Sequence, residues 1–194
     1  MAADQRLVTA SVAFQPPAPS ALPPLPGAGG GAPNEPRFTP SRPWLALLGF
    51  VGLCLLVGAA GGALTATSVH DWYPTLNAPP GKPPNWVFGP VWTTLYVMMG
   101  ASAWLVWKRA GAGPALRLWG WHLAANALWT PLFFGLRNPG AALIGILLLL
   151  VLLIATIRAF RRVSRLAEVL LWPYLAWVLF ATWLNLGFWW LNRG

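Results

Sequence analysis

Five apolar stretches, separated by turns and one longer loop, leave this chain few ways to fold. Each is about as long as the roughly 20 residues that a helix needs to cross the hydrocarbon core of a bilayer. Because backbone groups in lipid must bond within their own segment, each stretch is predicted to be a helix. They cover residues 44–66, 89–107, 116–136, 141–160 and 167–191. We therefore predict an all-α integral membrane protein, a five-transmembrane-helix bundle with a disordered N-terminal tail.

Charge is scarce along the chain. Only 9% of its residues are charged and 57% are hydrophobic, whereas a soluble domain carries about 25% charged residues. The composition therefore excludes an ordinary soluble fold. A net charge of +9 would suggest a nucleic-acid partner in a soluble protein. In a membrane protein orientation explains it better, so we predict a lipid bilayer and no nucleic acid as partner.

Basic residues gather on one side of the predicted bundle. With five spans, ten of the 13 Lys and Arg residues fall on the side of the tail, and the remaining three fall on the other. Cytoplasmic loops are enriched in Lys and Arg, so the amino terminus is predicted to be cytoplasmic, in a bacterial membrane rather than the mitochondrial outer membrane. The ten are Arg6, Arg37, Arg42, Lys108, Arg109, Arg117, Arg158, Arg161, Arg162 and Arg165, and the three are Lys82, Arg137 and Arg193.

Residues 1–43 differ in composition from the rest of the chain. They are rich in Ala, Pro and Gly and lack the apolar content of a core. We therefore predict a disordered tail at 1–43 and a membrane domain at 44–194. No apolar region follows a basic start, which argues against a secretory signal.

The loop between the first two spans combines prolines with aromatic residues. Proline fixes φ and removes a backbone donor, so regular helix and central strand are excluded there. Pro90 sits where a first-turn proline would open the second helix. The stiff loop is either a lid over an apolar site or an anchor at the lipid interface, where Trp and Tyr are common. Its prolines are Pro74, Pro79, Pro80, Pro83 and Pro84, and its aromatic residues are Trp72, Tyr73, Trp86 and Phe88.

Catalytic and metal-binding constellations are scarce. The four acidic residues all lie outside the deep parts of the spans, so no pair of carboxylates is available for acid–base catalysis. Cys54 is the single cysteine, and His70 and His122 fall in different elements, so neither a metal site nor an intrachain disulfide is predicted. The sequence predicts no catalytic residue and favours a binding protein over an enzyme. The acidic residues are Asp4, Glu35, Asp71 and Glu168.

Three polar residues fall inside predicted spans: His122, Asn126 and Asn185. Polar groups are costly in lipid, so each must face another helix or a cavity. Hydrogen bonding between helices explains any one of them alone. One face of the third span, however, carries two of them together with Trp129 and Phe133, which favours a polar–aromatic pocket. His122 could also bind haem iron, but no second axial ligand accompanies it.

Several motifs occur in the order and at the spacing of a known family. On these motifs the chain from residue 44 to its end resembles the TspO/MBR family, which comprises the tryptophan-rich sensory proteins of bacteria and the mitochondrial translocator protein, or peripheral-type benzodiazepine receptor. The motifs are Trp72-Tyr73-x-x-Leu76, Pro83-Pro84-x-Trp86, Pro90-Val91-Trp92-x-x-Leu95-Tyr96, Asn126-x-x-Trp129-x-Pro131-x-Phe133-Phe134-Gly135, Pro173-Tyr174-Leu175-Ala176-Trp177 and Phe180-Ala181-x-x-Leu184-Asn185.

This resemblance implies a homodimer with one apolar pocket per protomer under the first loop. Family ligands are porphyrins and haem, sterols and benzodiazepine-type drugs, and no cofactor is required. We predict that Trp92 and Trp177 form opposite walls of this pocket, with Asn126 as a polar contact and Tyr73 closing the top. The implied ligand-binding residues are Tyr73, Trp92, Tyr96, His122, Asn126, Trp129, Trp177 and Ala181.

The function implied is a membrane receptor or transporter-like protein that binds tetrapyrroles for sensing, sequestration or transport. An enzyme that breaks down porphyrin with light and oxygen is an alternative, with Trp92 and Trp177 as redox-active contacts. A sterol-binding translocator and a structural dimer that recruits partners through its tail are further alternatives.

The chain departs from the family pattern at three places. Pro80 and Gly81 stand where aromatic residues are common in the first loop, so the loop would grip a flat ligand differently. His122 replaces the usual Gln of the third helix, which would change the polar end of the pocket. The last helix lacks the Tyr of the sterol-recognition pattern of animal members, which lowers the expectation of sterol binding.

Pairs of small residues four apart mark places where helix backbones can approach closely. Gly58 and Gly62 form such a pair in the first span, and Gly120 and Ala124 form one in the third. We predict that the pair in the third span lies in the dimer interface.

Overall fold

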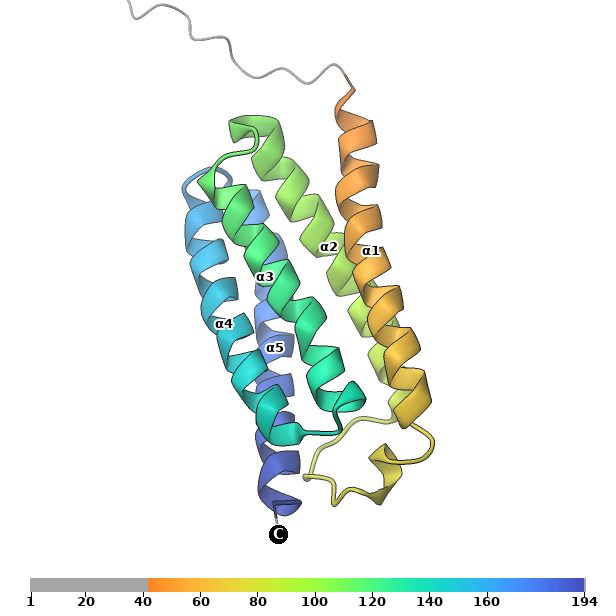
Figure 1. Ribbon diagram of the computed structural model, residues 1–194. Coiled ribbons are helices and arrows are strands. Elements are labelled where there is room, and N and C mark those ends of the chain that lie inside the picture. Colours follow the sequence, from red (N-terminus) through yellow and green to blue (C-terminus); the bar gives the residue numbers. More distant parts are fainter. Residues whose placement is uncertain (1–41, 194) are drawn as a thin grey trace, which may run out of the picture. The chain divides into compact units, whose positions relative to one another are not determined.

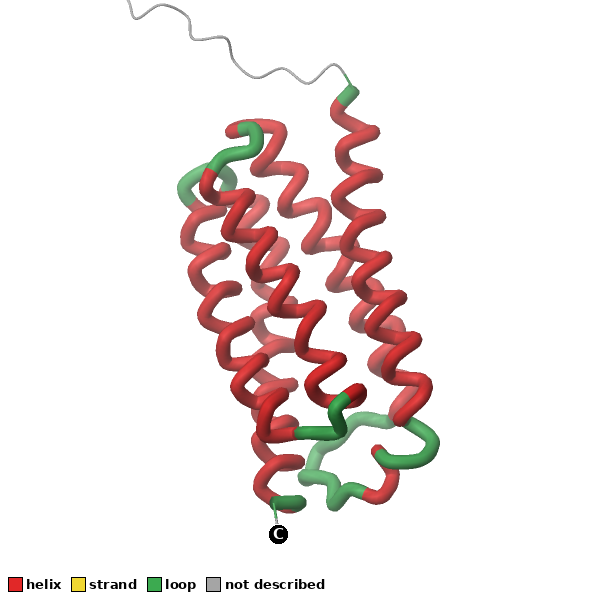
Figure 2. Tube along the Cα trace, viewed as in Figure 1, coloured by secondary structure: helices red, strands yellow, loops and turns green. Residues whose placement is uncertain are grey.

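The structure is a computed structural model that describes residues 42–193. The prediction of a disordered tail at 1–43 therefore lies almost wholly outside the described residues and stays a prediction. The described part is helical throughout, with turns and one long loop between the helices, which confirms the all-α five-helix fold (Figures 1 and 2). Its helices are α1 (Pro43–Ser68), α2 (Asn85–Ala110), α3 (Pro114–Thr130), α4 (Pro139–Arg161) and α5 (Arg165–Leu191).

Within the described residues, α1, α4 and α5 are long and apolar enough to cross a membrane by length and composition alone. Helices α2 and α3 pack beside them in the same bundle but carry more polar side chains. Two threonines of α2 donate hydrogen bonds to backbone carbonyls of the same helix. Thr93 Oγ1 donates to the Gly89 carbonyl at 2.9 Å, and Thr94 Oγ1 donates to the Pro90 carbonyl at 3.0 Å. Such bonds satisfy the hydroxyls without a partner helix.

The sequence marks the start of the last two helices. Asn138 caps α4 by accepting a hydrogen bond from the Ala141 amide at 2.9 Å. Ser164 caps α5 in the same way through the Ala167 amide at 3.3 Å. Because these side chains satisfy amides that have no partner inside the helix, each short turn between α3, α4 and α5 ends at a defined residue.

Helix α2 begins earlier than predicted. Its first residue is Asn85, directly after Pro84, and Pro90 lies inside the helix rather than in its first turn. The prediction that Pro90 opens the helix was therefore wrong. A helix can start as soon as the last loop proline has passed, because its first four amides need no intrahelical partner. Pro90 then removes a single hydrogen bond, the one to the Trp86 carbonyl.

Helix α3 continues into a π-helical turn, η2 (Pro131–Gly135). Pro131 has no amide to bond to the preceding turn, and the Leu136 amide donates instead to the Pro131 carbonyl, five residues back, at 2.8 Å. Such wider turns often occur at functional sites. Here the turn presents Phe133 and Phe134 to the end of the bundle where the long loop lies.

Helices α1 and α2 pack closely at Gly100. A Cβ added there would lie 2.6 Å from the Cα of Val51 on α1. Gly58 faces the ring of Tyr96, while Gly62 has open space beside it. Within the described chain, no helix backbone packs against the predicted pair Gly58 and Gly62, and the glycine that permits close backbone contact is Gly100 of α2.

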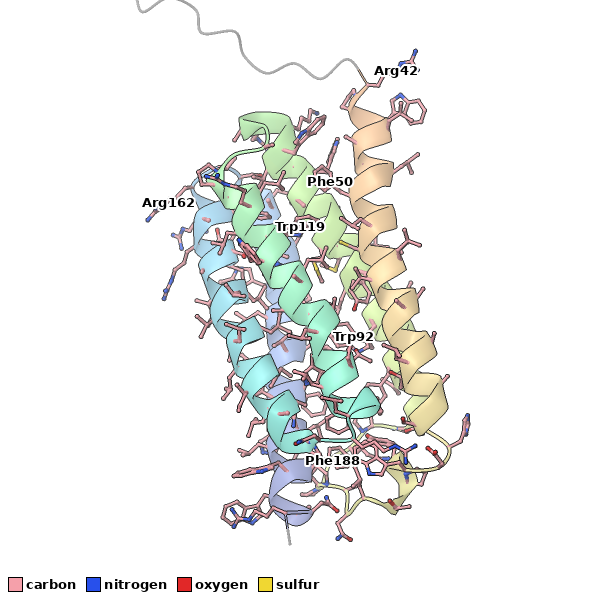
Figure 3. The ribbon with its side chains drawn as sticks, in the orientation of Figure 1. Arg42, Phe50, Trp92, Trp119, Arg162 and Phe188 are labelled. Atoms are coloured by element: carbon pink, nitrogen blue, oxygen red, sulfur yellow. The ribbon has the colours of Figure 1, made fainter. Side chains whose placement is uncertain are left out.

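The described basic residues fall at two ends of the bundle, as the span count predicted. The α2–α3 and α4–α5 turns lie beside the start of α1, where Arg109 donates to Ser164 Oγ at 2.7 Å. Arg42 and Arg162 project from this end, and Phe188 marks the other (Figure 3). At that other end lie the long loop (residues 69–84), which we call the aromatic loop, and the turn between η2 and α4 (Figure 1). Which end faces the cytoplasm stays a prediction.

Candidate ligand-binding cavity

A cavity of about 520 Å³ opens inside the bundle, next to the aromatic loop. Helices α1, α2, α3 and α5, the π turn and the loop all contribute to its lining. No Asp, Glu, Lys, Arg or His side chain is among the lining residues. They are Leu55, Gly58, Ala59, Gly61, Gly62, Thr65, Ala66, Val69, Tyr73, Asn85, Phe88, Gly89, Trp92, Thr93, Tyr96, Asn126, Trp129, Thr130, Phe133, Phe134, Trp177, Ala181, Leu184, Asn185 and Phe188.

One wall of the cavity is aromatic and centres on Trp92. Its indole stacks on Tyr96 with ring centroids 5.6 Å apart and an angle of 30°. It also meets Trp177 edge to face at 6.4 Å and 89°, and Phe88 contacts Trp177 from the other side at 5.8 Å. Trp92 and Trp177 therefore touch, and the prediction that they form opposite walls was wrong. Their helices α2 and α5 are neighbours, so the two indoles share one wall.

The wall contributed by α1 consists of small residues apart from Leu55. Gly58, Gly61, Gly62 and Thr65 recur at helical spacing, so they share the face that lines the cavity. Thr65 donates its hydroxyl to the Gly61 carbonyl at 2.9 Å. Of these residues Gly58 packs against the Tyr96 ring and Gly61 against Thr130, while Gly62 has open space beside it. The absence of a side chain at Gly62 therefore adds to the space of the cavity.

A chain of hydrogen bonds holds Tyr96 in place. Its hydroxyl donates to Asn126 Oδ1 at 2.8 Å, and Asn126 Nδ2 donates to the Tyr174 hydroxyl at 2.9 Å. Both bonds are buried, and together they satisfy the oxygen and one N–H of the Asn126 amide. Asn126 thus lines the cavity and also ties α2, α3 and α5 together.

A second polar contact joins α3 to α5. Trp129 Nε1 donates to Asn185 Oδ1 at 3.0 Å, and Asn185 Nδ2 donates to the Pro139 carbonyl at 2.7 Å. The Trp129 ring stacks on Phe133 at 5.3 Å and 27°. The indole nitrogen of Trp177, in contrast, is buried and has no hydrogen-bond partner among the described residues.

His122 lies away from the cavity. It is completely buried, and its ring packs against Tyr174 with centroids 5.5 Å apart. The ring faces the backbone of Trp119. Within the described residues, however, neither ring nitrogen meets the distance and angle of a hydrogen bond. Of the eight predicted ligand-binding residues it is the one that does not line the cavity. His122 stands behind Tyr174 and Asn126, so it does not supply an axial ligand to the cavity.

Tyr73 reaches from the aromatic loop into the end of the cavity. Its ring packs against Phe133, Phe134 and Phe188 with centroids 5.3–6.3 Å away. This burial raises the pKa of Tyr73 to about 12. The Tyr73 side chain forms part of the aromatic cluster that separates the cavity from the outside of the loop.

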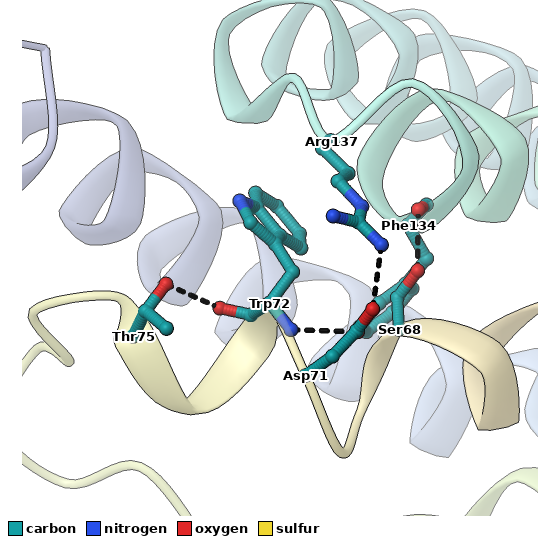
Figure 4. A network of polar contacts seen from close by, with 6 residues as sticks. All are labelled: Ser68, Asp71, Trp72, Thr75, Phe134 and Arg137. Atoms are coloured by element: carbon teal, nitrogen blue, oxygen red, sulfur yellow. Dashed lines mark hydrogen bonds and ion pairs between the residues drawn. The ribbon is translucent and has the colours of Figure 1, made fainter.

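Polar contacts tie the aromatic loop to the bundle near its start and at its middle. Ser68 Oγ donates to the Phe134 carbonyl at 2.9 Å, and Arg137 pairs with Asp71 at 2.8 Å (Figure 4). The amide of Trp72 and, after it, the Arg137 guanidinium hold the pKa of Asp71 below its usual value. In the middle of the loop, Asn192, which follows α5, bonds the amide and the carbonyl of Asn77 at 2.9 and 3.0 Å.

Several lining residues were absent from the predicted site. The α1 residues carry a usable signal, since small side chains recur there at helical spacing. Asn185 was recognised as a polar residue inside a span, but nothing in the sequence placed it beside Trp129. Phe134 and Phe188 enter through the π turn and the α5 end, whose geometry no local pattern indicates. In the described part of the chain, no group of three His, Cys, Asp or Glu side chains lies close enough to hold a metal.

Comparison with known proteins agrees with this architecture. The family model of the TspO/MBR family matches residues 50–191. The translocator protein of Bos taurus is 41% identical over 156 residues, which cover 78% of this chain and 92% of that protein. The tryptophan-rich protein TspO of Chlorobaculum tepidum is 42% identical over 139 residues, covering 70% and 88%. The tryptophan-rich sensory protein of Cereibacter sphaeroides is 38% identical over 142 residues, covering 73% and 88%. The chain therefore belongs to the TspO/MBR family and is a multi-pass integral membrane protein.

Proposed function

We propose that this protein binds a tetrapyrrole, a porphyrin or haem, in the cavity and acts as a membrane receptor or transporter-like protein that senses, sequesters or moves it. The observation that carries the proposal is the uncharged cavity with one continuous aromatic wall. Its volume of about 520 Å³ falls in the range of about 300–1,000 Å³ that is common for small-molecule sites. Other flat hydrophobic molecules would fit the same lining.

Stacking supports a flat ligand. Trp92, Tyr96, Trp177 and Phe88 adjoin one another along the wall, and each ring contact with a macrocycle would contribute about 0.5–1.5 kcal/mol beyond area burial. The small α1 residues opposite leave room for the ligand's other face. Binding and release need no catalytic acid or base. The relatives named translocator protein and tryptophan-rich sensory protein agree with moving or sensing a ligand.

Quenching of tryptophan fluorescence by protoporphyrin tests the proposal in detergent-solubilised protein. We expect Trp92→Phe and Trp177→Phe each to weaken binding several-fold, because Phe keeps most of the volume but offers less stacking area. Trp172→Phe is the matched control, since Trp172 lies on the outside of α5 and is 51% exposed. Unchanged affinity in both cavity variants would refute the assignment of the cavity as the porphyrin site.

Breakdown of the bound porphyrin by light and oxygen is a second candidate. The contact between Trp92 and Trp177 favours it, because two oxidisable indoles would adjoin the ligand. Illumination of the protein–porphyrin complex in air, followed by absorption spectroscopy, separates the candidates. A defined product that disappears in Trp92→Phe while binding is retained would favour the enzyme.

We also propose a homodimer that uses the outer face of α3. Gly120 and Ala124 are exposed there, and Gly120 has open space beside it. Two such faces could bring their backbones close together.

A further inference from the structure

Lys82 is a cation at the rim of a cavity that holds no charge of its own. Its ammonium lies 4.7 Å from the centroid of the Tyr73 ring, and Tyr73 lines the cavity. Lys82 forms no ion pair among the described residues. Nearby, Arg137 is occupied by Asp71 at 2.8 Å, and Arg193 stacks on Trp190 at 3.3 Å. Lys82 is therefore the cation at this end that remains available to a ligand's anionic group.

The backbone around Lys82 holds it at this rim. Gly81 has a φ of +83°, a conformation that favours glycine and turns the chain just before the lysine. Pro83 and Pro84 follow and restrict the backbone after it. Asn85, the first residue of α2, again lines the cavity. Lys82 thus projects from a short stiff segment that begins at a turn and ends at the cavity wall.

The cavity lining offers no positive charge to compensate a carboxylate. Its lining has no cationic side chain, and the hydroxyls of Thr65 and Thr93 already donate to backbone carbonyls. Burying a carboxylate without a counter-charge is costly. An acidic ligand must therefore keep its acid groups at the loop end while its apolar body occupies the cavity.

We propose that Lys82 binds the carboxylate of an amphipathic ligand whose flat apolar body fills the cavity. In the free protein the ammonium rests on the Tyr73 ring as a cation–π pair. In the complex it pairs with the carboxylate by a charge-assisted hydrogen bond. Lys82 then selects acids over their neutral esters and fixes which edge of the ligand faces the loop. This inference rests on the proposed porphyrin binding and names the ligand group that the loop recognises.

The test compares protoporphyrin, which carries two carboxylates, with its dimethyl ester. Both are titrated into wild type and Lys82→Gln, and tryptophan quenching reports affinity. An uncharged maltoside detergent is used, so that no lipid phosphate competes for the lysine. The ratio of the two affinities is compared between proteins, which cancels differences in how the porphyrins partition into micelles.

We expect wild type to bind the diacid about three- to tenfold more tightly than Lys82→Gln does, as for a partly exposed charge pair. The diester should bind both proteins equally, which also shows that the variant retains its cavity. Lys82→Arg should keep the diacid preference, and the matched control Arg193→Gln should not alter it.

An unchanged diacid preference in Lys82→Gln would overturn the role of Lys82 and leave porphyrin binding intact. Loss of both porphyrins in that variant would also overturn it, because it would mean that Lys82 merely supports the loop. Failure of wild type to bind either porphyrin would instead refute the proposed function and this inference with it.

Discussion

At the scale of single residues, three contacts hold the side chain of Tyr96 in position. Its ring stacks on Trp92, its hydroxyl donates to Asn126, and its edge rests on α1 at Gly58. A Cβ added at Gly58 would lie 2.5 Å from the Tyr96 ring. The absence of a side chain at Gly58 therefore determines the position that the Tyr96 ring can take beside the cavity.

The first prediction concerns this glycine. Gly58→Ala should push the Tyr96 ring towards the cavity and weaken porphyrin binding several-fold, since overpacking a well-filled site costs about 1–3 kcal/mol. Gly52→Ala, six residues earlier on α1 and free of contacts within 4 Å, is the matched control and should bind like wild type. Fluorescence quenching measures both. Wild-type affinity in Gly58→Ala would show that the ring has room to move.

Residue spacing predicted part of the site. Asn126 and Trp129 could be placed on one face because they belong to one helix, whose period is known. The contact between Trp92 and Trp177 could not be predicted, because it depends on how α2 and α5 are rotated against each other. For the same reason the prediction for His122 was wrong. His122 lies on the predicted face of α3, but closer to the basic end of the bundle than the cavity is.

At the scale of elements, the aromatic loop is a tied structure rather than a free connection. The prolines predicted its lack of regular helix, and the structure adds only the short 3₁₀ turn η1 (Tyr73–Thr75). Its ties join residues far apart in sequence, such as Asp71 with Arg137 and Asn77 with Asn192. No local pattern indicates such pairs, which explains why the sequence predicted a stiff loop but not its attachment.

The second prediction concerns the Asp71–Arg137 ion pair. Asp71→Asn should make the amides of residues 69–84 exchange with deuterium faster at neutral pH, with little change in overall stability because both side chains are exposed. The charge-reversed pair, Asp71→Arg with Arg137→Asp, should restore slow exchange. Mass spectrometry of loop peptides measures both effects. Equal exchange in wild type and Asp71→Asn would show that the pair does not hold the loop.

The pH dependence of this contact follows from the lowered Asp71 pKa. Because the folded pKa lies below the usual value of 3.8, the contribution of the pair is fully present above that value and is lost as the pH falls through the lowered pKa. The difference in exchange between wild type and Asp71→Asn should therefore persist down to about pH 4 and vanish only in stronger acid. A difference that vanishes well above the usual pKa would contradict the assignment.

At the scale of the whole molecule, the two ends of the described bundle differ in chemistry. One end carries Arg42 and the exposed arginines and lysine of α2, α3, α4, α5 and the α4–α5 turn, and the other carries the aromatic loop and the cavity. Charge counting along the sequence predicted this division, because it needs only the order of the spans. The cavity could not be predicted by counting, since its volume depends on which helices turn small residues inward.

The third prediction concerns which end of the bundle faces the cytoplasm. The basic end should face the cytoplasm, so reporter fusions in the α2–α3 turn and after the end of α5 should report opposite sides. A reporter in the aromatic loop should agree with the one after α5. Signals on the same side from the first two fusions would contradict the span count.

The fourth prediction concerns the dimer. A cysteine at position 120, in a Cys54→Ser background, should crosslink two copies in the membrane because the outer face of α3 is expected to meet its equivalent. A cysteine at position 144, where Ile144 is 73% exposed on α4, is the control and should stay monomeric. Crosslinking at 144 without crosslinking at 120 would move the interface to α4.

The small-residue wall of α1 has a consequence for how ligand preference can change. Exchanging one small apolar residue for another there, such as Gly62→Ala, changes the volume of the cavity without adding a polar group. Under the proposed function, α1 therefore limits the size of the ligand, whereas the rings of α2 and α5 and the Lys82 ammonium recognise its chemistry. Because these properties reside in separate segments of the chain, size and chemical preference can be redesigned one at a time, by exchanging α1 residues or loop and wall residues alone.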